Sequence, residues 1–525
     1  EGCADYRPRH PRQERETKPS YLSPGVYVEE VPAATRPIEG VGTAIAGFVG
    51  FAAQGPYNQP VLVTNWTQFV ETFGDLVENY ALGKAVYGYF NNGGGRAYIV
   101  RIPTSARPSS APMGELPSAG DKKIAALNVM ALNAGAQNVK VTVKDEGKVD
   151  DQPNYTVTIS ADGAKEESFT GTIGAGPSNL ASQVNTRSKI IRIQPNAIDE
   201  ALIASGLQEG TVALTGAEKA TPAKVETAAL IGDPAKRTGF AAFETLEEIT
   251  MIAAPDVAAA HAKGLIDLNA MKAVQAGMLA HCELMGNRMA ILDTPSGLTA
   301  QEASDWRMNT TGFDSKFGVA YWPWIQVFDQ TTGKNTAFPP SGHVAGLWGR
   351  NDNSRGVFKA PANEVILGAV GVDYPVTRGE MDMLNPQGLN SIKSFPGRGI
   401  RVWGARTLSS DAEWRYVNVR RYFNYLEESI LQGTQWAVFE PNDENLWGRI
   451  RRTISAFLVN EWRSGALFGS SPSEAFFVKC DGENNTAESI DLGMVIVEIG
   501  VAPVKPAEFV IFRLSQFSGG TSIAE

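Results

Sequence analysis

The sequence predicts an α/β, more broadly mixed α+β, protein of several domains with an inserted, mostly β domain and a detached strand at each end. Three observations support this prediction. Strand, helix and strand follow one another between residues 249 and 292, residues 104–238 contain no tryptophan, and prolines isolate the first and last strands. Strands that alternate with helices at this spacing are typical of a parallel sheet with crossover helices.

The first part of the predicted core spans residues 39–103. Residues 43–51 form a Gly- and Ala-rich apolar run that predicts a buried strand, and residues 97–102 predict another. Two helices are expected between them. Asn65 is placed to cap the first helix, and the second, near residues 81–90, ends at a run of Asn and Gly. This part therefore predicts a β-α-α-β unit.

Residues 104–238, called the inserted domain below, predict a mostly β structure. Ala, Gly, Ser, Thr and Asn dominate this stretch, and apolar and polar side chains alternate along residues 138–143 and 155–159. A period of two is typical of antiparallel strands with one face in water. We therefore interpret this stretch as a domain carried on the outside of the core.

The α/β pattern returns in a central domain, residues 239–400. Apolar strands are expected at residues 249–253 and 289–292, with a helix between them, which indicates a parallel crossover unit. The helix carries a row of apolar and sulfur-containing side chains on one face: Met271, Val274, Met278, Cys282 and Met285.

Residues 401–505, called the C-terminal domain below, predict two long helices at 411–432 and 443–465. Ser410 and Glu413 have the spacing of a capping box at the start of the first helix, and Gly433 is placed to end it. Its expected buried stripe is Tyr416, Val419, Phe423, Leu426 and Ile430.

Both ends of the chain predict strands that are separated from the body by prolines. Residues 1–20 are predicted to be a flexible tail, followed by an N-terminal arm, residues 21–38, and matched by a C-terminal arm, residues 506–525. A strand needs partners for its backbone N–H and C=O groups. Each arm could therefore add to the sheet of another subunit or fold back on its own chain, and composition leaves both open.

Composition excludes several classes of function. The net charge of -10 argues against nucleic acid as a main partner, and no run approaches the roughly 18 apolar residues of a membrane span. The sequence does not begin with a secretory signal pattern. Three well-separated cysteines, Cys3, Cys282 and Cys480, cannot form a disulfide framework or a metal knuckle. We expect a protein made in the cytoplasm with reduced thiols and no direct membrane insertion.

Four patterns in the sequence are candidate sites of chemistry. The Gly93–Arg96 loop lacks the Lys-Ser/Thr of a phosphate loop and precedes a strand. The segment Asn351–Gly356 resembles a calcium loop, but Ala362 stands at the position of the required bidentate Glu. Ser341, His343 and Asp373 could form a nucleophile, base and orienting group.

Asp293, at a strand end, is the best-placed single carboxylate for a site in an α/β fold, although a helix or turn cap is the better interpretation. Neither His281 nor His10 belongs to a metal cluster. We predict no catalytic residue, cofactor or metal. The alternative is an α/β hydrolase-like or nucleotide-binding enzyme built around Asp293 and Ser341.

Arginine is concentrated between residues 398 and 463. This region holds ten Arg, no Lys and eight acidic residues. Because the planar guanidinium favours fixed ion pairs, such a region is typical either of a protein interface or of an ordinary solvated helix face. The ten are Arg398, Arg401, Arg406, Arg415, Arg420, Arg421, Arg449, Arg451, Arg452 and Arg463.

Nine short motifs follow one another along the chain: YLSPGVYVEEV at 21–31, GGRAYIVR at 94–101, AYWPW at 320–324, PPSGHVAG at 339–346, KAPAN at 359–363, VWGARTL at 402–408, FEPND at 439–443, FFVKCD at 476–481 and APVKPAEF at 502–509. In sequence and in order, these motifs resemble those of the tail sheath proteins of contractile phage tails and related contractile injection systems. The resemblance covers residues 21–103 and about 240–517, and excludes the inserted domain.

The resemblance implies a structural protein and not an enzyme. It implies a homo-oligomer of stacked six-fold rings that forms a helical sheath around an inner tube, is assembled in an extended metastable state and contracts to drive the tube through a target envelope. Baseplate and tail terminator proteins would be further partners. The particle would be a phage tail or a phage tail-like injection particle, retained in the cytoplasm or released.

The resemblance also implies roles for particular residues. The arms would be strands donated to neighbouring subunits, with Val26, Tyr27, Val28 and Glu29 in one and Phe509, Val510, Ile511 and Phe512 in the other. The C-terminal domain would face the tube, and Arg449, Arg452 and Arg463 are the expected tube or lateral contacts.

Overall fold

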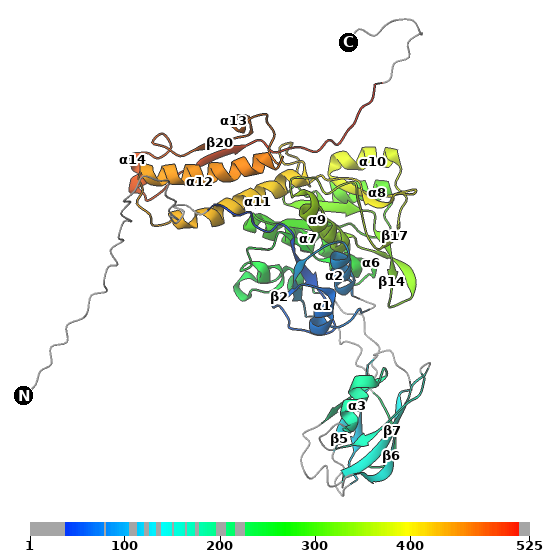
Figure 1. The fold of residues 1–525 in the computed structure, drawn as a ribbon. Helices are drawn as coiled ribbons and strands as arrows, with labels where there is room; N and C mark the ends of the chain where they lie inside the picture. Colours follow the sequence, from blue (N-terminus) through cyan, green and yellow to red (C-terminus); the bar gives the residue numbers. More distant parts are fainter. Residues whose placement is uncertain are drawn as a thin grey trace, which may run out of the picture.

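The computed structural model describes residues 37–77, 80–103, 113–119, 125–132, 138–149, 152–162, 165–173, 178–195, 206–215 and 226–513. Within these ranges the protein mixes helices and strands in several sheets (Figure 1). Figure 1 shows an α/β core in the middle, with the small inserted domain on one side and two long C-terminal helices on the other. The predicted tail and the arm residues Val26–Glu29 lie outside the described residues.

A nine-stranded sheet forms the centre of the core. Its strands follow the order β16 (Glu364–Val365), β19 (Gly399–Val402), β18 (Leu389–Phe395), β13 (Gly318–Trp322), β12 (Met289–Asp293), β11 (Met251–Ala253), β1 (Ile45–Gly50), β3 (Arg96–Arg101) and β2 (Val61–Val63). The six strands from β18 to β3 are parallel, while the pairings at the two edges, β18 with β19, β19 with β16, and β3 with β2, are antiparallel. The parallel pairing of β11 with β12 confirms the predicted crossover unit.

Helices cover this sheet and bury its strands, so that β1, β12 and β13 are buried along their whole length. They are α1 (Trp66–Phe73), α2 (Leu82–Asn91), α5 (Thr227–Ile231), α6 (Pro255–Ala262), α7 (Leu268–Met285), α8 (Ala300–Asp305), α9 (Ser341–Arg355) and α10 (Arg378–Leu384). Asn65 caps α1 as predicted, because its side chain accepts a 2.9 Å hydrogen bond from the Gln68 N–H. The predicted face of α7 is buried except for Met285, which is half-buried.

Smaller elements complete the core. One-turn helices are η1 (Pro234–Lys236), η2 (Gly239–Phe243), the π-helical η3 (Trp306–Thr311) and η4 (Asn385–Gln387). A three-stranded antiparallel sheet contains β15 (Lys334–Phe338), β14 (Ile325–Asp329) and β17 (Ala369–Val372).

The inserted domain contains two antiparallel sheets. One has the order β10 (Gly210–Ala213), β6 (Lys140–Val149), β7 (Gln152–Ser160) and β8 (Glu167–Thr172); the other has the order β4 (Met113–Pro117), β5 (Ala125–Ala131) and β9 (Ile191–Pro195), and α3 (Leu180–Arg187) accompanies them. The predicted alternation is confirmed, since Val141 and Val157 face a buried cluster while Thr142 and Thr156 do not. That cluster is separate from the hydrophobic core of the large sheet.

The C-terminal domain is built on a pair of helices. Its elements are α11 (Val417–Thr434), η5 (Gln435–Ala437), α12 (Glu444–Arg463), α13 (Pro472–Ala475), β20 (Phe476–Lys479), α14 (Ala487–Asp491) and β21 (Glu498–Val501). Asp443 caps α12 by accepting a 2.8 Å hydrogen bond from the Leu446 N–H. None of the helices in the described ranges has both the length and the apolar character needed to cross a bilayer.

The predicted capping box at Ser410 and Glu413 is wrong. The helix α11 begins only at Val417, and Ser410 instead donates its N–H and hydroxyl to the two carboxylate oxygens of Asp314, at 2.9 and 2.5 Å. A tertiary partner has therefore taken the side chain that the local pattern assigned to a cap. Gly433 lies in the last turn of α11, where an added Cβ would come within 2.5 Å of the Ile38 side chain.

Candidate functional site

The C-terminal domain carries a small sheet with unpaired edges. β20 and β21 pair with each other in antiparallel register, Phe476 opposite Val501 and Lys479 opposite Glu498, and no third strand joins them within the described ranges. Phe477 on β20 is 59% exposed. The sheet packs on the hydrophobic cluster of α11 and α12 through Phe476, Val478, Ile499 and Val501, and free sheet edges are templates for further strands.

The predicted C-terminal arm leaves the same domain with an apolar surface in water. The exposed fractions of Phe509, Val510, Ile511 and Phe512 are 72%, 70%, 79% and 83%. No strand is formed between residues 506 and 513 of the single chain. Four consecutive exposed apolar side chains are uncommon on a monomeric protein and mark an interaction surface. Donation of this segment to a neighbour remains a prediction.

The chain preceding β1 also lies on the C-terminal domain. Ile38 belongs to the hydrophobic cluster of α11 and α12, and the Val41 N–H donates a 3.1 Å hydrogen bond to the Ser429 hydroxyl. Gly433 leaves room for Ile38 beside the last turn of α11. The first described residues therefore contact the C-terminal half of α11. The last described residues leave the same domain after Glu508.

A buried ion pair joins the C-terminal domain to the core. The Arg421 guanidinium on α11 donates to both carboxylate oxygens of Asp352 on α9, at 2.9 and 2.5 Å, and its Nη2 donates to the Thr43 carbonyl at 3.0 Å. The same guanidinium lies 4.6 Å from the ring centroid of Trp348. Because the Thr43 hydroxyl also donates to Asp352 at 2.7 Å, the protein itself supplies hydrogen-bond partners to both charged groups.

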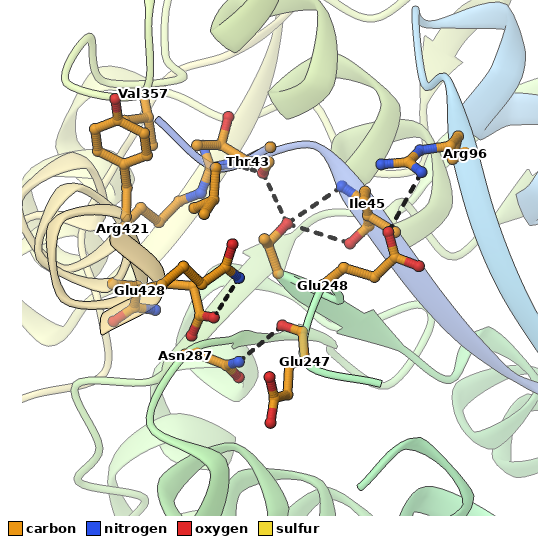
Figure 2. Close-up of a pocket in the computed structure, with 15 residues that line it drawn as sticks. Thr43, Ile45, Arg96, Glu247, Glu248, Asn287, Val357, Arg421 and Glu428 are labelled. Carbon is orange, nitrogen blue, oxygen red and sulfur yellow. Dashed lines mark hydrogen bonds and ion pairs between the residues drawn. The ribbon is translucent and has the colours of Figure 1, made fainter. Parts of the chain in front are cut away.

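A cavity of about 210 Å³ remains beside this pair, between the residues that precede β1 and the side of α11. Figure 2 shows its polar lining, with Glu247, Glu248 and Glu428 on different sides and Arg96 paired to Glu248. The contact between the core and the C-terminal domain is therefore a packed centre at Arg421 with a polar cavity at its edge.

The arginine-rich region supplies further contacts within the chain. Arg420 is buried on α11, where its side chain donates to Asn424 and Glu427 and lies 4.3 Å from the Trp414 ring centroid. Arg451 donates to the Cys480 carbonyl at 3.0 Å. The sequence interpretation offered an interface or a solvated face and missed these internal roles.

The three arginines proposed as contacts lie along one side of α12. At about 100° per residue, Arg449, Arg452 and Arg463 fall within roughly 60° of one another around the helix axis. Arg452 and Arg463 are exposed and form no ion pair within the described ranges, whereas Arg449 lies 3.5 Å from Glu440 and 4.4 Å from the Trp436 ring centroid. We call this row the arginine stripe.

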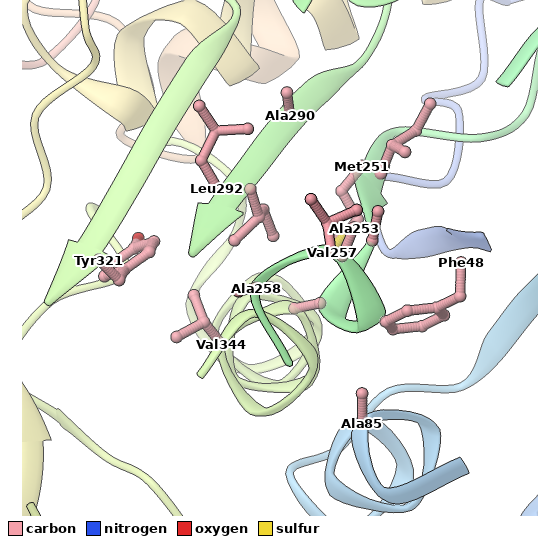
Figure 3. Close-up of a cluster of buried hydrophobic side chains, with 14 of the residues drawn as sticks. Phe48, Ala85, Met251, Ala253, Val257, Ala258, Ala290, Leu292, Tyr321 and Val344 are labelled. Atoms are coloured by element: carbon pink, nitrogen blue, oxygen red, sulfur yellow. The ribbon is translucent and has the colours of Figure 1, made fainter. Parts of the chain in front are cut away.

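The residues of the enzyme alternative come together only in part. The Asp293 carboxylate accepts the Ser341 N–H at 2.8 Å and the Ser341 hydroxyl at 2.6 Å, so it caps the start of α9, in keeping with the cap interpretation. Both residues are buried, and the adjoining cavity holds only about 10 Å³, room for about one water molecule. Figure 3 shows part of the buried apolar cluster of the core, which includes Leu292 and Val344, the chain neighbours of this region.

The other members of that alternative do not complete a catalytic group. His343 is buried, its Nδ1 has no hydrogen-bond partner within the described ranges, and burial lowers its pKa to about 4. Asp373 donates its backbone N–H to Trp324. Asn351–Arg355 lie in α9, with Asp352 bound to Arg421, so this segment is not a calcium loop. The described residues contain no group of three or more His, Cys, Asp or Glu side chains suited to a metal ion.

Asp293 gives a testable pH effect. Burial raises its pKa to about 7, although the hydrogen bonds from Ser341 oppose this shift. The folded state then binds the proton more tightly than the unfolded state, so this group's contribution to stability falls as pH rises from about 4 through 7. Urea unfolding at pH 5 and pH 8 should show Asp293→Asn gaining stability relative to wild type as pH rises. The exposed Asp491→Asn is the control, and an unchanged difference for Asp293→Asn would contradict this expectation.

Two family sequence models match the chain in succession. The phage tail sheath protein central domain matches residues 223–408, and the phage tail sheath C-terminal domain matches residues 409–517. The inserted domain up to residue 222 lies outside both matches.

Curated relatives extend this similarity along most of the chain. The tail sheath protein of Burkholderia phage BcepMu is 25% identical over 92% of this chain and 94% of its own length. A putative prophage major tail sheath protein of Pseudomonas aeruginosa is 31% identical over 43% of this chain and 57% of its own length.

Solved structures share the fold. The helical sheath of the anti-feeding prophage in its contracted state is 24% identical, with a TM-score of 0.57 over 95% of this chain and 100% of that one. The sheath of the extracellular contractile injection system PVC, also contracted, is 23% identical, with a TM-score of 0.55 over 95% and 99%. The two family models, which together match residues 223–517, and the relative that matches along most of the chain show that the chain belongs to the phage tail sheath protein family.

Proposed function

We propose that this protein is the structural subunit of a contractile sheath. The subunits polymerise as stacked six-fold rings around an inner tube, hold an extended metastable state, and contract to drive the tube through a target envelope. The observation that carries the proposal is the similarity over more than nine-tenths of the chain to a phage tail sheath protein. Solved sheaths described as contracted share the fold, which supports contraction as the working step.

The arms supply the connections between subunits. The unpaired edges of β20 and β21 and the exposed apolar residues Phe509–Phe512 are complementary, because an extended segment can add backbone hydrogen bonds to a free sheet edge. The N-terminal arm, with Val26–Glu29, would supply another such strand. Pairing of this kind persists when subunits rotate, since backbone hydrogen bonds in the shared sheet are kept while other surfaces exchange partners.

The body of the subunit moves as one unit in this proposal. The Arg421–Asp352 pair is buried and satisfied from both sides, so a change in the angle between α11 and α9 would leave charges without partners. Contraction then takes the form of rigid-body rotation against neighbouring subunits. No nucleotide is required, because the free energy comes from contacts that are better satisfied in the contracted sheath.

The arginine stripe on α12 faces a partner surface in the assembled sheath. Arg452 and Arg463 have no acidic partner within the described ranges, and an exposed guanidinium readily forms paired hydrogen bonds with a carboxylate. We assign the stripe to contacts with the inner tube or with a lateral neighbour. Baseplate and tail terminator proteins contact the ends of the sheath, and the inserted domain lies on the outside.

Neutralising the stripe is expected to weaken these contacts and leave the fold intact. The triple variant with Arg449, Arg452 and Arg463 changed to Gln should keep the wild-type melting temperature, because surface substitutions rarely change stability by more than about 0.5 kcal/mol. Its yield of tube-containing sheaths, counted by electron microscopy, should fall and should depend less on salt than the wild-type yield. The matched control changes Arg187, Arg192 and Arg237 to Gln. Equal yields for the two triple variants would contradict the assignment.

Negative-stain electron microscopy of the purified protein tests the proposed function directly. Ribbed hollow cylinders should form, and their width with and without the tube protein should separate extended from contracted packing. Small particles of one size, at high concentration and with tube protein present, would overturn the proposal. That result would lead back to the alternative at Asp293 and Ser341, for which Ser341→Ala should then abolish a measurable turnover.

A further inference from the structure

Among the described residues, Glu508 is the last at which side-chain hydrogen bonds hold the C-terminal arm to the body of the subunit. Its Oε1 accepts hydrogen bonds from Arg406 Nε at 2.9 Å and from Asn385 Nδ2 at 2.6 Å. Its Oε2 accepts from Arg406 Nη2 at 2.7 Å and from the Tyr416 hydroxyl at 3.0 Å. One carboxylate thus receives four hydrogen bonds from three side chains.

These three partners come from different elements that are themselves fixed. Asn385 begins η4, Arg406 follows β19, and Tyr416 is the residue before α11. Backbone N–H and C=O groups of Arg406 both bond to the side chain of Asn390, at 2.7 and 2.8 Å. The site that holds the Glu508 carboxylate is therefore tied to the large sheet, through Asn390, and to the start of α11, through Tyr416.

The ion pair between Arg406 and Glu508 lies in an enclosed environment that favours the charged form of the carboxylate. The side chains of Arg406 and Glu508 are only 11% and 18% exposed. Burial alone would raise the pKa of Glu508, but the hydrogen bonds from Arg406 and Asn385 more than offset it, so that the pKa lies below its usual value. A bidentate arginine-carboxylate pair fixes direction as well as distance.

The contrast with the next residues is abrupt. Phe509, directly after the anchored carboxylate, is 72% exposed, and the next three residues are exposed to a similar degree. A segment fixed at one end loses less conformational freedom when it pairs with a neighbour than a segment that is free along its whole length. Fixing the end also fixes the register in which the segment can reach a sheet edge.

We infer that Glu508 is the fixed root of the C-terminal arm, and that its four hydrogen bonds set the position and direction from which Phe509–Phe512 reach a second copy of this chain. This inference rests on the proposed sheath function. Glu508 and Arg406 are positioning residues: they act on assembly through the arm.

The test uses the full chain with Glu508→Gln, Arg406→Gln and the double variant. The amide keeps the size of the side chain but removes the charge and one acceptor. The matched control is Glu146→Gln, which breaks the exposed Lys144–Glu146 pair in the inserted domain. Sedimentation measures the critical concentration for sheath assembly, and near-ultraviolet circular dichroism checks the fold.

Loss of a charged hydrogen-bond network of this kind should raise the critical concentration about tenfold or more. The double variant should be no worse than the worse single variant, because both remove the same contact. The Glu146→Gln control should assemble like wild type. Equal critical concentrations for wild type and a folded Glu508→Gln would overturn the inference while leaving the sheath function in place.

A second measurement keeps the test independent of assembly. A nitroxide attached to Val510→Cys, in chains that also carry Cys3→Ser, reports arm motion in the dilute single chain; the remaining cysteines, Cys282 and Cys480, are buried. Its motion should become faster when Glu508→Gln is added. Unchanged nitroxide motion would contradict the role of Glu508 as the root of the arm, even if no sheath formed. Failure of the wild-type protein to assemble would instead contradict the proposed function.

Discussion

Deletion of residues 1–32 is expected to leave a folded monomer that no longer forms sheaths. The deletion removes the predicted strand Val26–Glu29, while Ile38, its pocket beside Gly433 and the Val41–Ser429 hydrogen bond all remain. The fold should therefore be kept, since no contact of the described core is lost. Size-exclusion chromatography and circular dichroism would follow the monomer, and electron microscopy would follow assembly.

A shorter deletion separates the arm from the tail. Removal of residues 1–20 alone takes away only the predicted flexible tail and should leave assembly unchanged. If the 1–32 deletion still produced sheaths of normal length, the arm would not be a donated strand, and the sheet edges of β20 and β21 would need another partner.

Replacement of Arg421 by Met is expected to cost about 3–5 kcal/mol of unfolding free energy, because it leaves the buried Asp352 carboxylate without its charge partner. The loss of the guanidinium from the face of Trp348 would add to this cost. Urea unfolding of the monomer measures the change. If Arg421→Met is too unstable to purify, the double variant described next supplies the measurement of unfolding free energy.

The double variant Arg421→Met with Asp352→Leu should recover most of that stability, since an apolar pair leaves no buried charge. Arg452→Met, on the exposed face of α12, is the surface control and should change stability by at most about 0.5 kcal/mol. A single Arg421→Met that cost no more than this control would mean that the pair does not hold the C-terminal domain to the core.

Local patterns in the sequence were sufficient where neighbours along the chain decide the structure. Asn65 caps α1, and the alternation around Val141 and Val157 gives antiparallel strands, because both signals lie within one element. The crossover between β11 and β12 was also predictable, since a strand, helix and strand of this length have few ways to pack.

Long-range partners decided the features that were missed. Ser410 bonds to Asp314, almost a hundred residues away, and not to a helix start. Asp256 is buried and accepts N–H groups from Phe51 and Ala81, which no local pattern indicates. The full strand order of the large sheet likewise depends on pairings such as β13 with β18 that only the folded chain brings together.

The arginines show the same limit at the candidate site. In the sequence, Arg420 and Arg421 look no different from Arg452 and Arg463. α11 is packed between α12 and the core, so polar residues such as Asn418 and Arg421 are buried. Of the predicted apolar stripe, Val419 and Leu426 are buried, while Tyr416, Phe423 and Ile430 are half-buried. A helix covered on two sides needs polar groups that find partners inside, and the burial of Arg420 and Arg421 could be recognised only once α9 and α12 were in place.

Near the N-terminal end of the described structure, Ile38 packs against α11. Near its C-terminal end, Glu508 accepts a hydrogen bond from Tyr416, the residue that precedes α11. In a sheath held together by its two arms, a pull from one subunit to the next would therefore run along the C-terminal domain, from arm to arm. The large sheet would share this load through Asn390 on β18, which holds the backbone of Arg406. The inserted domain joins the core between β3 and α5, outside this path from arm to arm. It can therefore be present without interrupting the connection between subunits.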